Sequence, residues 1–222
     1  MSRLTENIWN NQFCFNKVEN PKIWIADMID WTLPDIEIWN NPVFREMKNW
    51  KVVEYKGLKN FIHIKNENQS IYIFDNHNHA LKYRIDEYKQ WNITFWFDLI
   101  HIDQHTDMNQ SEFELDLEKP NLDVYNVWNF IQPATKTWFI SHVEQINTEY
   151  KLLNFETDEN DLILDIDLDF RSPEMSIEKY SETIEKAKNL ISNSRIVTIA
   201  TSPYFLDNEL AIKLCKILLS KK

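Results

Sequence analysis

The chain has 222 residues, of which 43% are hydrophobic and 14% aromatic; this composition excludes a disordered chain and allows one sizeable domain. Asp and Glu number 35 and Lys and Arg 24, so the net charge is −11, which argues against nucleic-acid and anionic-membrane partners and favours a cationic substrate. The cysteines, Cys14 and Cys215, form no disulfide framework, and the chain starts without an apolar h-region. We therefore expect a cytoplasmic protein with no signal peptide and no membrane span.

Glycine is nearly absent, and Gly57 is the single one in the sequence. This excludes the glycine-rich phosphate loops of ATPases and of dinucleotide-binding enzymes. Because glycine usually fills backbone positions with positive φ, we expect asparagine to fill many of them here.

The sequence has no internal repeat and no linker rich in Pro, Gly or Ser, so we expect a single domain over residues 1–222. Within it, residues 1–60 are expected to form an irregular portion rich in Trp and acidic groups, and residues 61–222 the core. The acids and tryptophans of the irregular portion either hold a cationic peptide through carboxylates and cation–π contacts or form aromatic packing with a solvated acidic face. They are Trp24, Asp27, Asp30, Trp31, Asp35, Glu37 and Trp39.

From residue 61 onward, apolar strands alternate with helices. Short apolar runs predict strands over Ile71–Phe74, Phe97–Ile102, Thr137–Ser141, Leu162–Leu168 and Ile196–Ala200. The pattern predicts helices over His79–Tyr88, Val124–Ile131 and Ser176–Ile191, and a final helix that Asp207 caps. The alternation predicts a three-layer α/β/α fold with a mostly parallel sheet, whose ligand site lies at the carboxyl ends of the strands.

Acidic and histidine side chains gather where these strands end. Asp165, Asp167 and Asp169 alternate along one strand, so all three project to the same side. Burying several carboxylates on one face is very unfavourable unless a cation neutralises them. The run Asp103-Gln-His105-Thr-Asp107 repeats the same spacing beyond the preceding strand. Oxygen ligands with some nitrogen suit manganese or a similar divalent ion, and shared carboxylates can bridge a pair of ions.

Structural roles stay open for some of these side chains, because carboxylates at strand ends also cap helices or face water. We expect His63 and His101 to be structural, with His101 facing away from Asp103 or packing in the sheet. His77 could simply hydrogen-bond a backbone carbonyl.

The motifs resemble those of the arginase/deacetylase superfamily, in particular its dinuclear manganese ureohydrolase branch. Asp103–Asp107 is similar to the D-x-H-x-D signature, Asp165–Asp167 to the D-x-D element, and Asn78–Leu81 to the segment that carries the first histidine ligand. A closer resemblance, over roughly residues 70–215, is to a small family that includes peptide arginases of ribosomal natural-product pathways. The matching segments are Asp75–Leu81, His101–Asp107, Asn129–Ala134 and Leu164–Phe170.

The resemblance implies an arginase-like core and a hydrolase that converts arginine residues of a ribosomally made precursor peptide to ornithine, with release of urea. It implies that one manganese is held by His79, Asp103, Asp107 and Asp165, and the other by His105, Asp103, Asp165 and Asp167. Asp103 and Asp165 would bridge the ions together with a hydroxide, and Asp169 would lie outside the ligand set.

Further roles are expected for residues near these ligands. Asp107 would accept a proton from the nucleophile. His142 is the candidate proton shuttle for the leaving amine, although a structural histidine at a strand end fits as well. Asn129 and Phe130 would line the substrate entry or only pack the neighbouring helix.

The chain departs from free-arginine ureohydrolases in one segment. Where those enzymes place a glutamate that grips the guanidinium, this chain has Ile199–Pro203, which contains no acid. The loops that bind the α-groups of a free amino acid are not recognisable either. Both departures favour an arginine residue within a peptide, and the sequence sets no oligomeric state.

Three alternatives stay open. A deacetylase or amidohydrolase on the same scaffold would bind one zinc, whereas Asp107 and Asp167 favour a pair of ions. A hydrolase of small guanidines such as agmatine would need no peptide. A non-catalytic peptide-binding protein would keep the metal only for stability.

Overall fold

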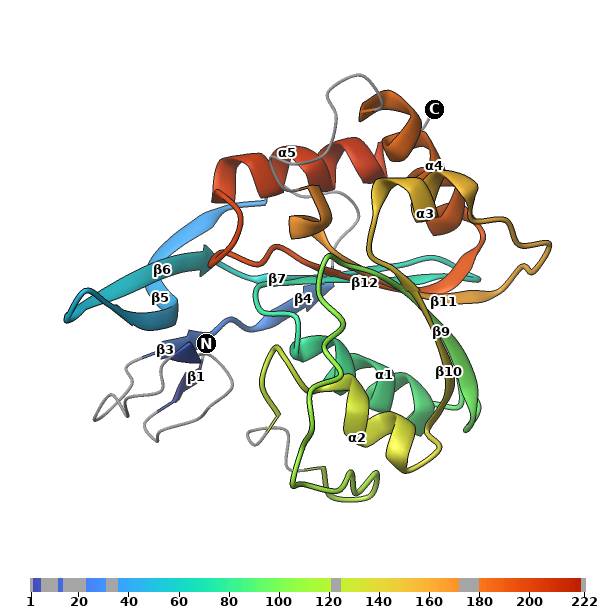
Figure 1. Cartoon of the computed structure of the whole chain (residues 1–222), viewed down its shortest axis with the longest axis horizontal. Coiled ribbons are helices and arrows are strands. Elements are labelled where there is room, and N and C mark those ends of the chain that lie inside the picture. Colours follow the sequence, from blue (N-terminus) through green and yellow to red (C-terminus); the bar gives the residue numbers. More distant parts are fainter. Residues whose placement is uncertain are drawn as a thin grey trace.

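The computed structural model describes residues 2–4, 12–13, 23–30, 36–120, 125–171 and 180–220. Its centre is a seven-stranded sheet with the strand order β10-β9-β11-β12-β8-β7-β4 (Figure 1). These strands are β4 (Met28–Asp30), β7 (Phe61–Lys65), β8 (Ser70–Phe74), β9 (Phe97–Ile102), β10 (Ile140–Ile146), β11 (Leu162–Asp167) and β12 (Ser194–Ala200). Two smaller sheets are formed by β1 (Ser2–Leu4) with β3 (Ile23–Ile25), and by β2 (Gln12–Phe13) with β5 (Ile38–Lys48) and β6 (Lys51–Leu58).

Helices cover both faces of the main sheet. One face carries α1 (His79–Lys89) and α2 (Ile131–Lys136), and the other carries α3 (Glu149–Asn154), α4 (Tyr180–Ser192) and α5 (Asn208–Leu219) (Figure 1). Every residue of β8 and β11 is buried, as expected for strands covered on both sides. The three-layer α/β/α fold predicted from the sequence is confirmed. Among the described residues, we find no helix with the length and apolar character needed to cross a membrane.

The main sheet is parallel except at the pair β7 and β8, which a tight turn joins. Strands β10, β9, β11, β12 and β8 all run parallel. Strand β7 pairs antiparallel with β8 because a short turn joins them, closed by a hydrogen bond from Asn66 N–H to the Gln69 carbonyl at 2.8 Å; only an antiparallel pair can be joined so tightly. The sheet extends through β7 to β4, which comes from the amino-terminal stretch.

Several boundaries differ from the sequence predictions. Residues 127–130 form a turn instead of a helix, and α2 starts only at Ile131. Pro133 lies in the first turn of α2, where its missing N–H leaves no intrahelical bond unmade. Strand β10 begins at Ile140, not at Thr137, and the chain beyond Asp167 turns into a short 3₁₀ helix. Residues 124 and 176–179 of the predicted helices lie outside the described residues.

Other element boundaries agree with the predictions. Helix α1 begins at His79. Asp207 caps α5, because its carboxylate accepts hydrogen bonds from the N–H groups of Glu209 and Leu210 at 2.9 and 3.2 Å. Both helices therefore start where the sequence placed their first turns.

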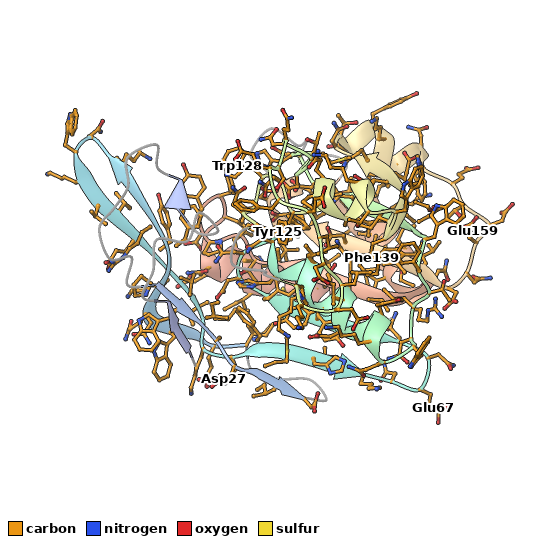
Figure 2. The ribbon with its side chains drawn as sticks, turned by 90° about the horizontal axis from the view of Figure 1, so that it is seen from below. Asp27, Glu67, Tyr125, Trp128, Phe139 and Glu159 are labelled. Carbon is orange, nitrogen blue, oxygen red and sulfur yellow. The ribbon has the colours of Figure 1, made fainter. Side chains whose placement is uncertain are left out.

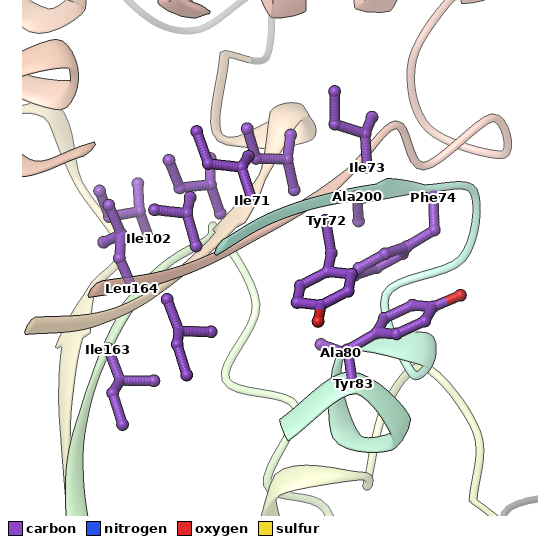
Figure 3. Packing of buried hydrophobic residues seen from close by; sticks show 14 of the residues in the cluster. Ile71, Tyr72, Ile73, Phe74, Ala80, Tyr83, Ile102, Ile163, Leu164 and Ala200 are labelled. Atoms are coloured by element: carbon purple, nitrogen blue, oxygen red, sulfur yellow. The ribbon is translucent and has the colours of Figure 1, made fainter. Parts of the chain in front are cut away.

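The core shows the two-residue alternation of a strand buried on both faces. In Figure 3, Ile73 projects to one side of β8, while Tyr72 and Phe74 project to the other side, toward Tyr83 of α1. The Tyr83 ring stacks with Tyr72 at 4.7 Å and with Phe74 at 5.3 Å between centroids. This packing gives the segment that follows β8 a rigid base.

Positive φ angles occur mainly at residues other than asparagine, so this prediction is wrong for most of the described positions. Asn49 has a φ of 51°. The others are Trp50, Trp91, Trp96, Asp107, Trp138, Asp161 and Ser202. Asp107 and Ser202 lie at the carboxyl ends of the strands, where strained backbone accompanies functional sites more often than elsewhere.

Gly57 is required for space. A Cβ atom at this position would lie 2.5 Å from Oδ2 of Asp75. Oδ1 of Asp75 accepts a hydrogen bond from Leu58 N–H at 2.7 Å, and the Asp75 carbonyl accepts one from Ser202 N–H at 2.9 Å. Asp75 therefore fastens β6 and the segment after β12 to the loop that begins after β8.

Candidate metal centre

The carboxyl ends of the parallel strands bring the acidic and histidine motifs to one edge of the sheet. His77 follows β8, Asp103 follows β9, and Asp165 and Asp167 lie on the last half of β11. The register pairs Asp165 with His101, so the motifs of β9 and β11 lie side by side. His77, Asp103, Asp165 and Asp167 are all 3% exposed or less. A cluster of buried ionisable groups therefore forms where the fold class places ligand sites.

His77 lies at the centre of the carboxylates. Its Nδ1 is 2.9 Å from Oδ2 of Asp107 and 3.2 Å from Oδ2 of both Asp103 and Asp167. Its Nε2 is 2.9 Å from Oδ2 of Asp165. One imidazole thus contacts the carboxylates of both motifs.

His79, the histidine expected among the ligands, is not brought to this cluster. It is the first residue of α1, and its buried ring packs 5.2 Å from Phe61 and 6.1 Å from Phe74 between centroids. The loop after β8 turns between the two histidines, so His77 faces the strand ends while His79 faces the apolar core. The spacing of the two residues in the sequence does not reveal which one faces the site.

His101 faces the cluster, and the expectation that it faces away from Asp103 is wrong. Its Nδ1 is 2.9 Å from Oδ2 of Asp165, and its Nε2 is 3.5 Å from Oδ2 of Asp103. Residues 101 and 103 are two apart, so a strand projects both to the same side. The alternation of side chains along a strand could therefore have predicted that His101 faces the cluster.

Asp165 is held from behind by a buried arginine. Nη2 of Arg84 lies 2.5 Å from Oδ1 of Asp165, and both side chains are 0% exposed. Thr198 Oγ1 donates a hydrogen bond to the same oxygen at 2.5 Å. The other oxygen contacts His77 and His101, so Asp165 is placed to orient two imidazoles. Arg84 is not among the site residues predicted from the sequence, although Ala80, Arg84 and Glu87 share the buried face of a predicted helix.

Asp103 presents its two oxygens to different histidines. Oδ2 lies 3.2 Å from Nδ1 of His77, and Oδ1 lies 3.2 Å from Nδ1 of His105. His105 also lies 3.3 Å from Oδ2 of Asp169, and its side chain is 34% exposed. The structure therefore adds Asp169 to the outer, more accessible part of the cluster, although the resemblance left it outside the ligand set.

The remaining candidate residues lie elsewhere. His142 lies in β10, paired with Asp98 at the start of β9, and its 66% exposed side chain is 3.7 Å from Glu144, so it is not brought to the cluster. Phe130 is fully buried, with its ring 5.0 Å from that of His77, and so packs behind the site. Asn129 Oδ1 accepts a hydrogen bond from Asn126 N–H at 3.0 Å within the turn before α2.

The acidic, Trp-rich stretch of the amino-terminal portion is only partly described. Trp31 and Asp35 lie outside the described residues. Glu37 forms an ion pair with Lys59 at 2.6 Å, and the same ammonium lies 5.8 Å from the centroid of Trp39. These two side chains thus contact a cation of the chain itself.

The histidines of the cluster are in a strongly negative environment. Burial alone would lower the pKa of His77, but the charges of Asp165 and Asp167 raise it well above its usual value. Burial also opposes protonation of His101, yet its contacts with Asp103 and Asp165 raise its pKa to about 9. Contacts with Asp103 and Asp169 raise the pKa of His105 to about 11.

The aspartates show the complementary effect. Burial raises the pKa of Asp107 to about 6. Burial, followed by the charge of Asp167, raises the pKa of Asp169 to about 8. Burial acts in the same direction on Asp165, but the charges of Arg84 and then His77 lower its pKa well below the usual value. The site therefore favours additional positive charge at its centre.

The donor atoms fit a divalent cation. Within the described part of the chain, four buried atoms of this cluster lack a hydrogen bond, namely His77 Nδ1, His101 Nε2, Asp103 Oδ2 and Asp169 Oδ1. His77 Nδ1 and His101 Nε2 lie 3.2 and 3.5 Å from Asp103 Oδ2. Separations of about 3 Å are those of neighbouring donors around an ion with bonds of about 2.0–2.2 Å. Imidazole nitrogen with carboxylate oxygen suits manganese or iron.

A small pocket leads to this cluster. It is lined by the buried side chains of His77, Asp107 and Asp167, which we call its base, and by the rings of Phe44, Trp128, Tyr204 and Phe205. Glu159 precedes the start of β11 and so marks the amino ends of the parallel strands. Figure 2 shows Trp128 far from Glu159. The pocket has a volume of about 20 Å³, far below the roughly 300–1,000 Å³ of pockets that enclose a whole small molecule.

The fold is similar to that of a known crystal structure. A hypothetical agmatinase from Burkholderia thailandensis matches 67% of this chain with 12% sequence identity and a TM-score of 0.50. The match spans 56% of that agmatinase, so this chain corresponds to little more than half of its length. No protein-family model and no curated protein matches the sequence. The structural likeness identifies the fold as arginase-like, with the buried cluster at the strand ends.

Proposed function

We propose that the protein is a dinuclear manganese hydrolase that converts arginine residues of a ribosomally made precursor peptide to ornithine and releases urea. The observation that carries this proposal is the buried cluster of aspartates and histidines at the carboxyl edge of an arginase-like sheet. The agmatinase neighbour supports a hydrolase of the ureohydrolase type, and the donor atoms support a metal.

A pair of ions is supported by the position of Asp103. Its two oxygens face His77 and His105 at 3.2 Å each, which is the arrangement of a carboxylate shared by two ions. One ion would be held by His77, Asp103 and Asp107, and the other by Asp103, His105 and Asp169, because each trio has donor atoms within 4.8 Å of one another. Asp165 would orient His77 from behind.

A divalent ion bound here supplies Lewis acidity and lowers the pKa of water, so that hydroxide is available near neutral pH. In the proposed reaction, the bond between the guanidinium carbon and the δ-nitrogen breaks. The oxygen of water becomes the carbonyl oxygen of urea, and the δ-nitrogen leaves as the ammonium group of ornithine. Asp107 lines the base of the pocket, 2.9 Å from Nδ1 of His77, where it is placed to hold a proton and pass it to the leaving nitrogen.

The pocket supports a guanidinium at the end of a long side chain. Its base carries Asp107 and Asp167, and the described residues that line it include no Lys or Arg to pair with the α-carboxylate of free arginine. The net charge of −11 favours approach of a basic peptide. These features support arginine within a peptide over free arginine.

Agmatine is the second candidate substrate. It carries a guanidinium and has no carboxylate, so it meets the same requirements of the pocket, and the structural neighbour is a hypothetical agmatinase. The two candidates differ in what lies beyond the guanidinium, outside the pocket.

A panel of substrates tests the proposal. Manganese-loaded protein is incubated with arginine-containing peptides, agmatine and free arginine, and urea release and peptide mass are followed. We expect urea and ornithine from a peptide, and loss of both in Asp103→Asn. His142→Ala is a control with an exposed histidine, and should keep the activity. Urea from agmatine alone would select the second candidate, and no urea from any substrate by the metal-loaded protein would refute both.

A further inference from the structure

We propose that Trp128, Tyr204 and Phe205 form an aromatic collar that selects a planar cation by cation–π contact and holds it over the carboxylates of the pocket. This inference rests on the proposed function for the reaction, but it concerns binding and can be tested separately. It assigns to aromatic rings the grip on the guanidinium for which no acidic residue is available in Ile199–Pro203.

The three rings stand at steep angles to one another around one pocket. Tyr204 and Phe205 have centroids 4.5 Å apart with planes at 89°, and Trp128 and Phe205 have centroids 6.5 Å apart with planes at 73°. Phe44 extends the wall, with its centroid 4.9 Å from that of Tyr204. Because the rings are not parallel, their negative faces point in different directions, and the Phe205 ring also lies 4.8 Å from the His105 ring between centroids. A cation within about 6 Å of a ring centroid gains from such a face.

The base of the pocket complements the edge of a planar cation. Asp107 and Asp167 provide carboxylate oxygens there, and Ser202 Oγ fixes Asp167 with a hydrogen bond to Oδ2 at 2.6 Å. A guanidinium could stack one face on a ring and direct its N–H groups to these oxygens. A neutral urea group of the same shape would instead direct its carbonyl oxygen at carboxylates. The pocket should therefore discriminate by charge between groups of equal size.

The collar residues stand on backbone that is held in place. The N–H groups of Phe205 and Leu206 both donate to the Ser202 carbonyl at 2.9 Å, in the turn after β12. The N–H of Trp128 donates to Oδ1 of Asn126 at 2.9 Å, and its carbonyl accepts from Asn109 N–H at 2.9 Å. Because the backbone at these positions is held by hydrogen bonds, binding costs less conformational entropy for ordering the side chains.

Substitutions of Phe205 can distinguish the effect of its aromatic ring from the effect of its volume. Phe205→Leu removes the π face and keeps an apolar side chain, whereas Phe205→Tyr keeps the face. Phe95→Leu is the matched control, because Phe95 is 45% exposed, compared with 43% for Phe205, and lies before β9 at the opposite end of the sheet. The probes are N-acetylarginine methylamide and its neutral isostere, N-acetylcitrulline methylamide.

Binding to the manganese-loaded protein is followed by tryptophan fluorescence within the mixing time of a stopped-flow instrument, and urea is measured in the same samples. We expect Phe205→Leu to weaken binding of the arginine probe about fivefold to tenfold, with less than a twofold change for the citrulline probe. Phe205→Tyr and Phe95→Leu should bind both probes as the wild type does.

Two results would overturn the collar: unchanged binding of the arginine probe by Phe205→Leu, or equal loss of both probes. A wild-type protein that does not prefer the cation would overturn it as well. The hydrolase can fail separately. If no urea appears but Phe205→Leu loses the preference for the cation, the collar stands without the proposed reaction. If urea appears and the preference is unchanged in Phe205→Leu, the reaction stands without the collar.

Discussion

Arg84 is the buried cation that holds Asp165, and Arg84→Met tests how much the site depends on it. The two side chains are 0% exposed and their closest atoms are 2.5 Å apart. Removing one partner of a buried ion pair leaves the other charge uncompensated, which costs about 3–5 kcal/mol. We expect Arg84→Met to lower the free energy of unfolding by this amount, measured by denaturation in urea.

The same substitution should weaken metal binding. Asp165 contacts Nε2 of His77 and Nδ1 of His101 at 2.9 Å each, and so fixes which nitrogen of each ring faces Asp103. Loss of the outer partner of a metal-binding histidine typically costs about 10–100-fold in metal affinity. Because Asp165 itself is left without its cation, we expect a loss in this range, measured by calorimetric titration with manganese.

Arg195→Met is the control for both measurements. Nε of Arg195 lies 3.1 Å from Oδ1 of Asp161, but the two side chains are 37% and 58% exposed. Exposed pairs contribute about 0–1 kcal/mol, so this variant should stay close to the wild type. Arg84 does not support the site if Arg84→Met is destabilised no more than Arg195→Met and binds manganese with unchanged affinity.

Three further variants test separate parts of the structure. Gly57→Ala should lower the free energy of unfolding by about 1–3 kcal/mol, because its Cβ would lie 2.5 Å from the Asp75 carboxylate; chemical denaturation measures this, and a neutral effect would contradict the close approach. His77→Ala should lose manganese binding by at least about tenfold, whereas His79→Phe should keep it; calorimetry that gives the reverse order would exchange their roles. Burial lowers the pKa of His79 from 6.5 to about 4, so the unfolded chain binds protons more tightly and stability falls as the pH decreases from 6.5 toward 4, by at most about 3 kcal/mol. His79→Phe should lose this part of the pH dependence, and an unchanged pH profile of the unfolding free energy would refute the assignment.

The alternation of apolar strands and helices predicted the layers of the fold because buried parallel strands leave a strong signal. The runs that became β8, β9 and β11 are mostly apolar, and acidic or histidine residues lie within their last residues or just after them. The edge strand β10 is only partly buried, so its limits were harder to predict. The sequence pattern predicts a helix that ends at Ile131, before Pro133, whereas Pro133 lies in the first turn of α2, where a proline fits well.

The site could be predicted as a set of motifs, but its contacts depend on the turn after each strand. Spacing placed Asp103, His105, Asp107, Asp165 and Asp167 at one edge of the sheet, and the structure brings them together. Spacing could not choose between His77 and His79, because the choice depends on where α1 begins and which way its first ring faces. The contact between Arg84 and Asp165 could not be predicted, because the sequence does not show that the buried face of α1 lies against β12.

Crystals grown with manganese would reveal whether this cluster binds a pair of divalent ions. Anomalous scattering should show two manganese peaks per chain, one beside His77, Asp103 and Asp107 and the other beside Asp103, His105 and Asp169. Absence of both peaks, with His77 still in contact with Asp107, would contradict the claim, as would a single zinc ion.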